Sequence, residues 1–108
     1  MQIKYQIIDS DLIFWFSGEL DEYASNYVRD KIDAVIVSTH FLRVIFDLSA
    51  LTFADSTGIG LFIGRYKLLA KNKIPLYIRS PLPQMDKIMR TTGLYEIMPI
   101  IEEDKHAR

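Results

Sequence analysis

The stretch from residue 44 to residue 72 constrains the fold of this chain more than any other. Residues 44–48 (Val-Ile-Phe-Asp-Leu) form a nearly continuous apolar run, typical of a strand covered on both faces. Apolar residues then recur on one helical face, at positions 59, 62, 63, 66, 69 and 70. Asn72 follows and can take the left-handed conformation that ends a helix. The stretch therefore predicts a buried strand, a short turn and a helix.

The turn between this strand and this helix is Ala54-Asp55-Ser56-Thr57-Gly58, with Ser56 where a helix N-cap is expected. A helix start presents unpaired N–H groups and the positive end of the helix dipole, so it accommodates an anion. Gly58 and Gly60 leave room there for another molecule to approach. Ser56 is therefore either only a helix cap or the centre of a site, and the turn alone does not decide.

Strands and helices alternate along the rest of the chain after a leading hairpin. Residues 2–7 alternate polar with apolar residues, and residues 12–16 are apolar on both sides, which predicts a hairpin. Trp15 is expected in the core. Asp21 is placed to cap a helix that ends near Ser38, with Ala24, Val28, Ile32, Val35 and Ile36 on its apolar face.

The last third of the chain predicts a strand, a helix and a final extended piece. Residues 74–79 form the strand, and Ser80-Pro81 is expected to start a helix that stops at Gly93. Residues 95–101 form a short strand or an extended segment. The order of elements indicates an α/β domain, with a mixed sheet of four to five strands packed with three to four helices.

Composition sets the limits on function. The 108 residues suit one domain, expected over residues 1–101, with a short polar tail over 102–108. A net charge of −1 gives no footprint for nucleic acid or an anionic membrane. The absence of cysteine excludes a disulfide framework and fits a cytoplasmic location. The N-terminus does not resemble a signal peptide, and no apolar stretch is long enough to span a membrane.

Signals for catalysis are weak. Ser56 lacks the Gly-x-Ser-x-Gly elbow of esterases, because Ala54 precedes Asp55. His40 falls in a predicted loop and His106 in the predicted tail, so neither is marked as a general base. The spacing of histidine and carboxylate residues suits no metal site. We expect a protein that is not an enzyme and that holds neither a metal nor a cofactor.

Three aspartates could form a carboxylate cluster, namely Asp21, Asp47 and Asp55. Capping and turn roles account for them more simply. A nucleotide site is the better rival, because Gly58, Gly60 and Gly64 follow a strand and open a helix, loosely like a dinucleotide fingerprint. Against this, the glycine spacing is wrong and the chain is too short for a full two-halved dinucleotide fold.

A second face of the central helix carries Leu61, Arg65 and Leu68 at positions i, i+4 and i+7. Two leucines with an arginine between them, beside the Ser56 end, are suited to docking a partner. The other interpretation is a wider core face. The rival nucleotide site has one further residue in its favour. Arg79, near the end of a later strand, lies where an NADP-binding protein would place a phosphate contact.

Several motifs, taken together, resemble those of a known family. Residues 47–60 read Asp-Leu-Ser-x-Leu-x-Phe-x-Asp-Ser-Thr-Gly-Ile-Gly, and residues 64–67 read Gly-Arg-Tyr-Lys. Gly-Glu-Leu-Asp at 18–21 and Ser-Pro at 80–81 match in the same order. The chain closely resembles STAS domains, most of all the bacterial antagonists of anti-sigma factors. The continuation at 64–67 is closest to the antagonists of the anti-sigma-F factor in spore-forming bacteria.

The resemblance covers nearly the whole chain and departs from the family pattern at Ala54, which replaces a methionine, and at Thr57, which replaces a serine. It implies a STAS-like α/β fold. It also implies an unphosphorylated antagonist that binds an anti-sigma factor with serine kinase activity and so frees a sigma factor. Phosphorylation of the serine that corresponds to Ser56 ends this association, and a serine phosphatase restores it.

The site that the resemblance implies is a partner-binding surface around Ser56, without a role for nucleic acid or a membrane. The residues expected in it are Asp21, Asp55, Ser56, Thr57, Gly58, Gly60, Leu61 and Arg65. The alternative is a nucleotide-binding or scaffolding STAS domain without a phosphorylation switch.

Overall fold

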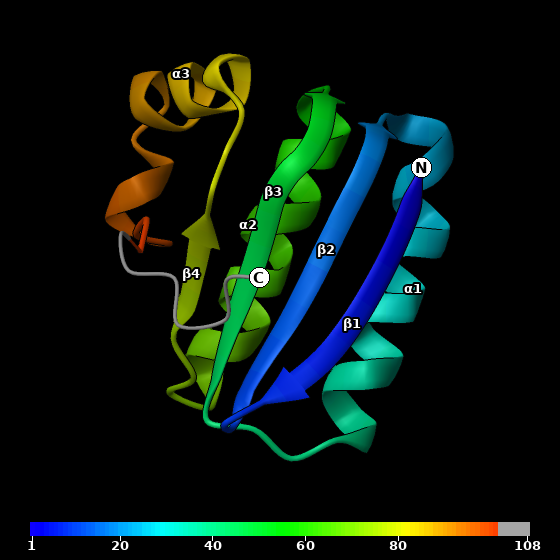
Figure 1. The fold of residues 1–108 in the computed structure, drawn as a ribbon, viewed down its shortest axis with the longest axis vertical. Helices are drawn as coiled ribbons and strands as arrows, with labels where there is room; N and C mark the ends of the chain where they lie inside the picture. Colours follow the sequence, from blue (N-terminus) through cyan, green and yellow to red (C-terminus); the bar gives the residue numbers. More distant parts are fainter. Residues whose placement is uncertain (102–108) are drawn as a thin grey trace.

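The fold starts with a hairpin and continues with parallel strands joined by helices (Figure 1). The computed structural model describes residues 1–101. Its elements in chain order are β1 (Gln2–Ile8), β2 (Asp11–Leu20), α1 (Glu22–Ser38), β3 (Arg43–Ala54), α2 (Ser56–Lys71), β4 (Leu76–Arg79), α3 (Pro83–Thr91) and the 3₁₀ turn η1 (Leu94–Glu96).

The sheet has four strands in the order β1-β2-β3-β4. The β1–β2 pair is antiparallel, and the β2–β3 and β3–β4 pairs are parallel, so the sheet is mixed as predicted. Asp9 and Ser10 join β1 to β2 with positive φ angles of 52° and 70°, the combination of a tight hairpin turn that follows the twist of the strands. The predicted hairpin is confirmed.

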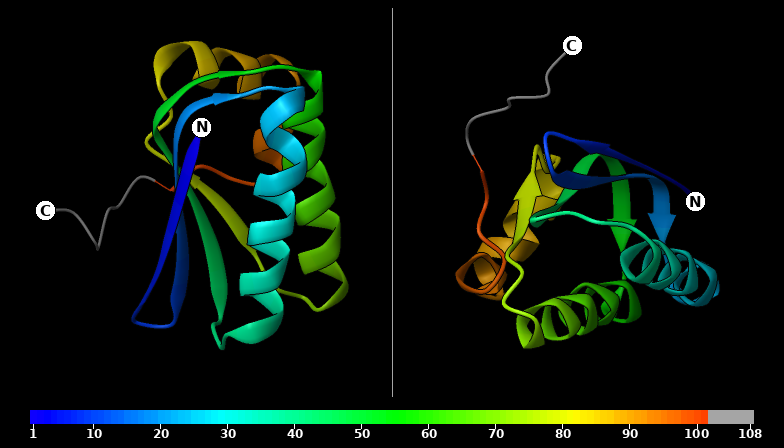
Figure 2. Two further views of the ribbon diagram at one scale, coloured as in Figure 1. Left: turned by 90° about the vertical axis from the view of Figure 1, so that its right-hand side faces the viewer. Right: turned by 90° about the horizontal axis from the view of Figure 1, so that it is seen from below.

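Helices α1 and α2 lie side by side over the same face of the sheet (Figure 2). The core beneath α2 is aromatic: the rings of Phe16, Phe46 and Phe62 have centroids 5.0–5.4 Å apart. The predicted apolar stripe of α1 faces the core too, with Val28 and Ile32 fully buried. Helix α3 packs across the end of β3, and Gln84 there donates a hydrogen bond to the carbonyl of Thr52 (3.1 Å).

The structure corrects the predicted start of the last helix. Helix α3 begins at Pro83, and Leu82 before it is extended, with ψ of 157°. The physical reason is the proline itself, because the residue before a proline is driven out of the helical region. Proline suits the first helical position, so Pro83 takes the place that the sequence had suggested for Pro81. Gly93, with φ of 75°, follows the helix where the predicted stop lies.

Other predictions change in detail. The two central strands β2 and β3 run past residues 16 and 48 to Leu20 and Ala54. Residues 95–101 form no full strand: after η1, a single parallel bridge joins Ile100 to Ile78. Trp15 is half-buried, and its ring faces the guanidinium of Arg79 at 5.8 Å.

The predicted tail, with His106, lies outside the described residues. None of the helices in residues 1–101 combines the length and the apolar character that a membrane span requires.

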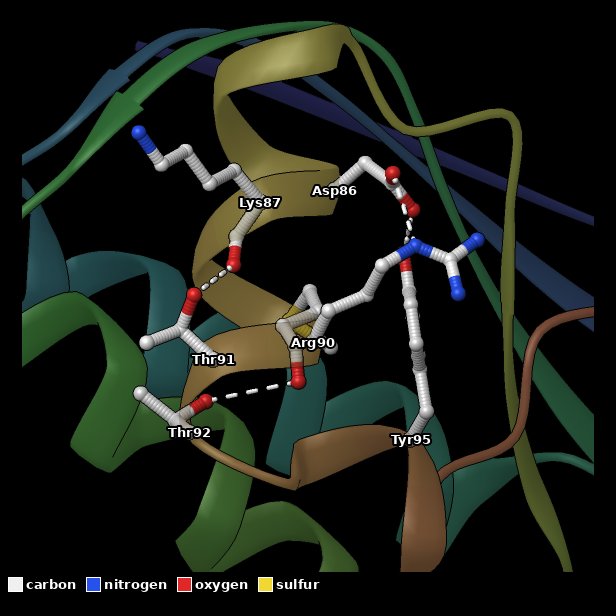
Figure 3. A network of polar contacts seen from close by, with 7 residues as sticks. Asp86, Lys87, Arg90, Thr91, Thr92 and Tyr95 are labelled. Carbon is white, nitrogen blue, oxygen red and sulfur yellow. Dashed lines mark hydrogen bonds and ion pairs between the residues drawn. The ribbon is translucent and has the colours of Figure 1, made fainter.

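A polar contact fastens α3 to the turn that follows it (Figure 3). The Tyr95 hydroxyl donates to one carboxylate oxygen of Asp86 (2.7 Å), and Nε of Arg90 donates to the other (3.0 Å). The bond from Tyr95, and to a smaller extent the bond from Arg90, holds the pKa of Asp86 below its ordinary value. Burial, and then the bond to Asp86, raises the pKa of Tyr95.

We expect Phe62→Ala to lower the free energy of unfolding by about 3–5 kcal/mol, because the fully buried ring would leave a cavity between the sheet and α2. Urea unfolding monitored by circular dichroism measures the change. Phe53→Ala is the matched control, since it removes the same side chain from a position that is 47% exposed. Equal losses in the two variants would contradict the assignment of Phe62 to the core.

We expect Tyr95→Phe to move the pKa of Asp86 upward, towards its ordinary value of 3.8, because it removes the largest cause of the depression. A depressed carboxyl pKa stabilises the fold above about pH 4, and this contribution disappears as the pH falls through the folded pKa. The stability gap between wild type and Tyr95→Phe should therefore narrow in acid. NMR titration of the Asp86 carboxyl group and urea unfolding at several pH values test this; a gap that widens in acid would contradict it.

Candidate functional site

Two helix starts meet at one end of the sheet. Strands β2 and β3 are parallel and in register there, with Leu20 opposite Ala54, and each strand is followed directly by an aspartate and a helix. Asp21 accepts a hydrogen bond from the backbone N–H of Ala24 (3.0 Å), which caps α1 as predicted. Asp55 accepts one from the N–H of Gly58 (2.9 Å) and caps α2. The parallel register thus places both capped helix ends side by side.

The carboxylate of Asp55 joins the two ends. Its second oxygen accepts a hydrogen bond from the N–H of Glu22, the first residue of α1 (3.1 Å), and its own N–H donates to the carbonyl of Leu20 (3.3 Å). One side chain therefore satisfies N–H groups of two helices, which otherwise have no partner within their own helix. Asp55 fixes α2 relative to α1 at the predicted site.

Gly58 is required by packing within the domain. A Cβ atom at this position would lie 2.5 Å from the carbonyl oxygen of Leu20 and 3.0 Å from its Cγ. Gly58 is also buried, whereas Gly60 is exposed. The expectation that both glycines leave room for an approaching molecule therefore applies to Gly60, and Gly58 brings α2 close to β2.

The predicted N-cap is wrong by one residue. Asp55 is the cap, and Ser56 is the first residue of α2. A carboxylate and a hydroxyl cap helices about equally well, but the carboxylate of Asp55 also reaches α1. Ser56 is exposed, and its hydroxyl forms no hydrogen bond with any described residue. Its side chain is thus free to meet another molecule.

The backbone at Ser56 suits an anion. The N–H groups of Ser56 and Thr57 have no acceptor in the described part of the chain, as is usual in a first helical turn. They point out of the positive end of α2, where an anionic group is stabilised. A phosphate on the Ser56 hydroxyl would lie next to these donors.

The rim of this end is acidic and aromatic. Glu19 lies near the end of β2, Asp21 follows that strand directly, and Glu22 is the first residue of α1. The N–H of Glu22 donates to Asp55, so this acidic stretch adjoins the cap of α2. Tyr23 is 85% exposed and Phe53 is 47% exposed. The sequence pattern did not single out either aromatic residue. Tyr23 lies outside the apolar stripe of α1, and Phe53 lies beyond the apolar run of residues 44–48, and these positions could have revealed them. Exposed aromatic side chains are common at the centres of protein interfaces.

The predicted second face of α2 divides between the core and a contact with α1. Leu61 is only 6% exposed and packs in the core. The prediction of an exposed docking leucine is therefore wrong at this position, and the alternative of a wider core face is confirmed there. Nε of Arg65 lies 3.0 Å from a carboxylate oxygen of Asp33 on α1. Arg65 therefore links the two helices, and Leu68 is half-buried.

The remaining carboxylate lies elsewhere. Asp47 lies about 26 Å back along the chain of β3 from Asp55, at about 3.3 Å per residue, and does not join a cluster with it. Its carboxylate accepts from Nε of Arg79 (2.8 Å) in a buried ion pair and from Ser49. Arg79 is thus buried, and away from the start of α2, which disfavours the rival nucleotide site in which it would contact a phosphate. Within residues 1–101 no three histidine or acidic residues are grouped to hold a metal ion.

The comparison with protein families agrees with this arrangement of a hairpin, parallel strands and two capped helices. Residues 2–107 match the sequence profile of the STAS domain. The chain belongs to the STAS domain family.

Relatives of this STAS domain support the same assignment. It is 32% identical over 107 residues to an anti-sigma F factor antagonist from Paenibacillus polymyxa, an alignment that covers 99% of this chain and 92% of the relative. The solved structure of the phosphorylated form of the Bacillus cell fate determinant SpoIIAA superimposes with a TM-score of 0.73, at 27% identity over 94% of this chain and 93% of that one.

A third relative shows the fold alone. The crystal structure of a putative anti-sigma factor antagonist from Thermotoga maritima gives a TM-score of 0.84 at 19% identity, over 94% of this chain and 86% of that one. The resemblance seen in the motifs around Asp55 and Ser56 is confirmed as membership of the family, and relatives of this STAS domain are antagonists of anti-sigma factors.

We expect Asp55→Ala to destabilise the domain by about 1–2 kcal/mol, since it removes a cap, and Ser56→Ala to change the stability by less than about 0.5 kcal/mol. Thermal and urea unfolding measure both. Asp55→Asn is the control, because an amide oxygen still accepts one hydrogen bond. If Ser56→Ala were the more destabilising variant, the serine would be the cap after all.

Proposed function

We propose that this STAS domain is an anti-sigma-factor antagonist whose partner is an anti-sigma factor with serine kinase activity. In its unphosphorylated form it binds this partner and frees a sigma factor, and phosphorylation of Ser56 ends the association. The observation that carries the proposal is the exposed Ser56 hydroxyl at the first position of α2, uncommitted to any bond in the described residues. That relatives are antagonists of anti-sigma factors supports it.

The proposed switch is electrostatic and local. A phosphate adds about −1.5 to −2 charges at neutral pH. The positive end of α2 and the N–H groups of Ser56 and Thr57 accommodate it, so the domain stays folded. In a contact with the partner, however, the phosphate would be buried beside Asp55, where an unpaired charge is costly. Phosphorylation therefore weakens the complex without unfolding the domain.

The expected site residues take different parts in this proposal. Ser56, Thr57 and Gly60 are exposed and touch the partner. Asp21, Asp55 and Gly58 position the first turns of α1 and α2, through the two caps and the close approach of α2 to Leu20. The buried Leu61 supports α2 from the core. Arg65 flanks the contact surface through its pairing with Asp33.

In this proposal the domain is a substrate and a binding partner, without catalysis or a cofactor of its own. A serine phosphatase restores the unphosphorylated form. The cell compartment is the cytoplasm, where a sigma factor acts and where a chain without cysteine needs no oxidising environment.

Incubation with the cognate anti-sigma kinase and ATP should add one phosphate, which peptide mapping by mass spectrometry should place on Ser56. Ser56→Ala should bind the kinase as the wild type does and resist modification. Ser56→Asp should keep its stability, because aspartate near a helix start suits the dipole, and yet bind weakly. Calorimetric titration with the kinase measures the affinities, and Thr57→Ala is the control that should still be phosphorylated.

Undiminished binding by Ser56→Asp, or a phosphate mapped to Thr57, would contradict the switch. The first result would favour a STAS domain that serves as a scaffold.

A further inference from the structure

A small groove runs between α1 and α2 next to the switch serine. Its volume is about 220 Å³, and its lining includes Asn26 and Arg29 from α1 and Thr57, Gly60, Gly64 and Arg65 from α2. Thr57 is the neighbour of Ser56, so this α1–α2 groove adjoins the proposed contact surface. The volume lies below the roughly 300 Å³ at which small-molecule sites begin, and suits a single side chain.

The packing of the domain does not explain the glycines of the groove. A Cβ atom added at Gly60 or Gly64 would meet nothing within 4 Å, in contrast to the clash at Gly58. Glycine inside a helix is less stable than alanine, because the unfolded chain loses more conformational freedom. Two such positions one turn apart therefore weaken α2 without any benefit to packing inside the described domain. Their benefit would come from a molecule that approaches the helix closely.

The two arginines of the groove have weak carboxylate partners. Within residues 1–101, Arg29 pairs only with the exposed side chain of its neighbour Asp30, through two contacts of 3.3–3.4 Å to the same oxygen. Nε of Arg65 lies 3.0 Å from Oδ1 of Asp33, yet both buried atoms lack a hydrogen bond of acceptable geometry in the described part of the chain. The exposed Arg29–Asp30 pair contributes little to stability, so Arg29 can exchange it for a better acceptor. The Arg65–Asp33 pair is more enclosed, with the Arg65 side chain 13% exposed, but its poor hydrogen-bond geometry leaves Arg65 able to take a better acceptor too.

We propose that the α1–α2 groove receives a carboxylate side chain of the anti-sigma factor, which lies over Gly60 and Gly64 and pairs with Arg29 and Arg65. The complementary charge selects this occupant: planar guanidinium groups bind carboxylates strongly, and a partly enclosed site strengthens the pairing. This inference rests on the proposed function, because it names how the same partner is recognised. The groove fixes the orientation of the partner, whereas the phosphate on Ser56 decides whether it binds.

The test is calorimetric titration of the unphosphorylated variants with the cognate anti-sigma factor. ADP replaces ATP in the titration, so that no phosphate is transferred. Arg29→Glu should lower the affinity about tenfold or more, by replacing an attraction with a repulsion. Lys71→Glu makes the same change of charge at the far end of α2 and should alter the affinity less than about twofold. An affinity that is unchanged or higher in Arg29→Glu would overturn the proposal.

A second pair of variants tests the shape of the groove. Gly64→Leu should fill it and lower the affinity about tenfold, while its melting temperature stays at or above that of the wild type. Ala70→Leu adds a leucine to an exposed position of α2 outside the groove and should bind normally. Normal binding by Gly64→Leu would overturn the proposal. Saturable binding of inorganic phosphate that Arg29→Glu abolishes would also overturn it, in favour of a free-anion site.

The two levels of inference fail separately. If the wild type does not bind any anti-sigma factor, the proposed function is wrong and the groove has no such occupant. If the wild type binds and Ser56→Asp does not, but the groove variants bind like the wild type, only the role of the groove is wrong.

Discussion

The arrangement of this end of the domain depends on the carboxylate of Asp55, which accepts hydrogen bonds from the first turns of two helices at once. This requires β2 and β3 to be parallel and in register at Leu20 and Ala54, so that the chain leaves both strands at the same height. It also requires a glycine at position 58, because any larger residue would push α2 away from the carbonyl of Leu20. The strand register, the Asp55 cap and Gly58 therefore together determine how the starts of α1 and α2 lie against each other.

The division of labour between Asp55 and Ser56 is compatible with the proposed phosphorylation of a serine that stands in a structural turn. If the serine hydroxyl were the cap, a phosphate on it would remove a hydrogen bond that holds the start of α2. Because the carboxylate of Asp55 caps the helix, the hydroxyl of Ser56 contributes little to the fold. A change of charge at this position then acts on the contact surface, and the stability of the domain and its affinity for a partner can vary independently.

The sequence predicted features that depend on local patterns. The hairpin, the cap at Asp21 and the buried position of Phe62 follow from turn chemistry, capping preference and helical spacing, and the structure confirms them. The sequence could not predict contacts across the fold, such as Asp55 with Glu22 or Arg65 with Asp33. These contacts depend on the register of the sheet and on the distance between α1 and α2. The local pattern places the cap one residue late, at Ser56, because a serine and an aspartate satisfy the same capping preference. The roles of Ser56 and its neighbours in binding stay predictions.

The charges around the start of α2 are unevenly distributed, and this bears on how one surface can combine selectivity with a switch. The segment from Glu19 to Glu22 is acidic, whereas the groove on the other side of Thr57 carries Arg29 and Arg65. A partner that fits both must present opposite charges in a matching order, so a partner in the wrong orientation meets like charges on both sides. Ser56 contributes no charge to this pattern unless it carries the proposed phosphate. In the proposed switch, fixed residues therefore determine which partner the surface recognises, while a single phosphate on Ser56 determines whether that partner binds.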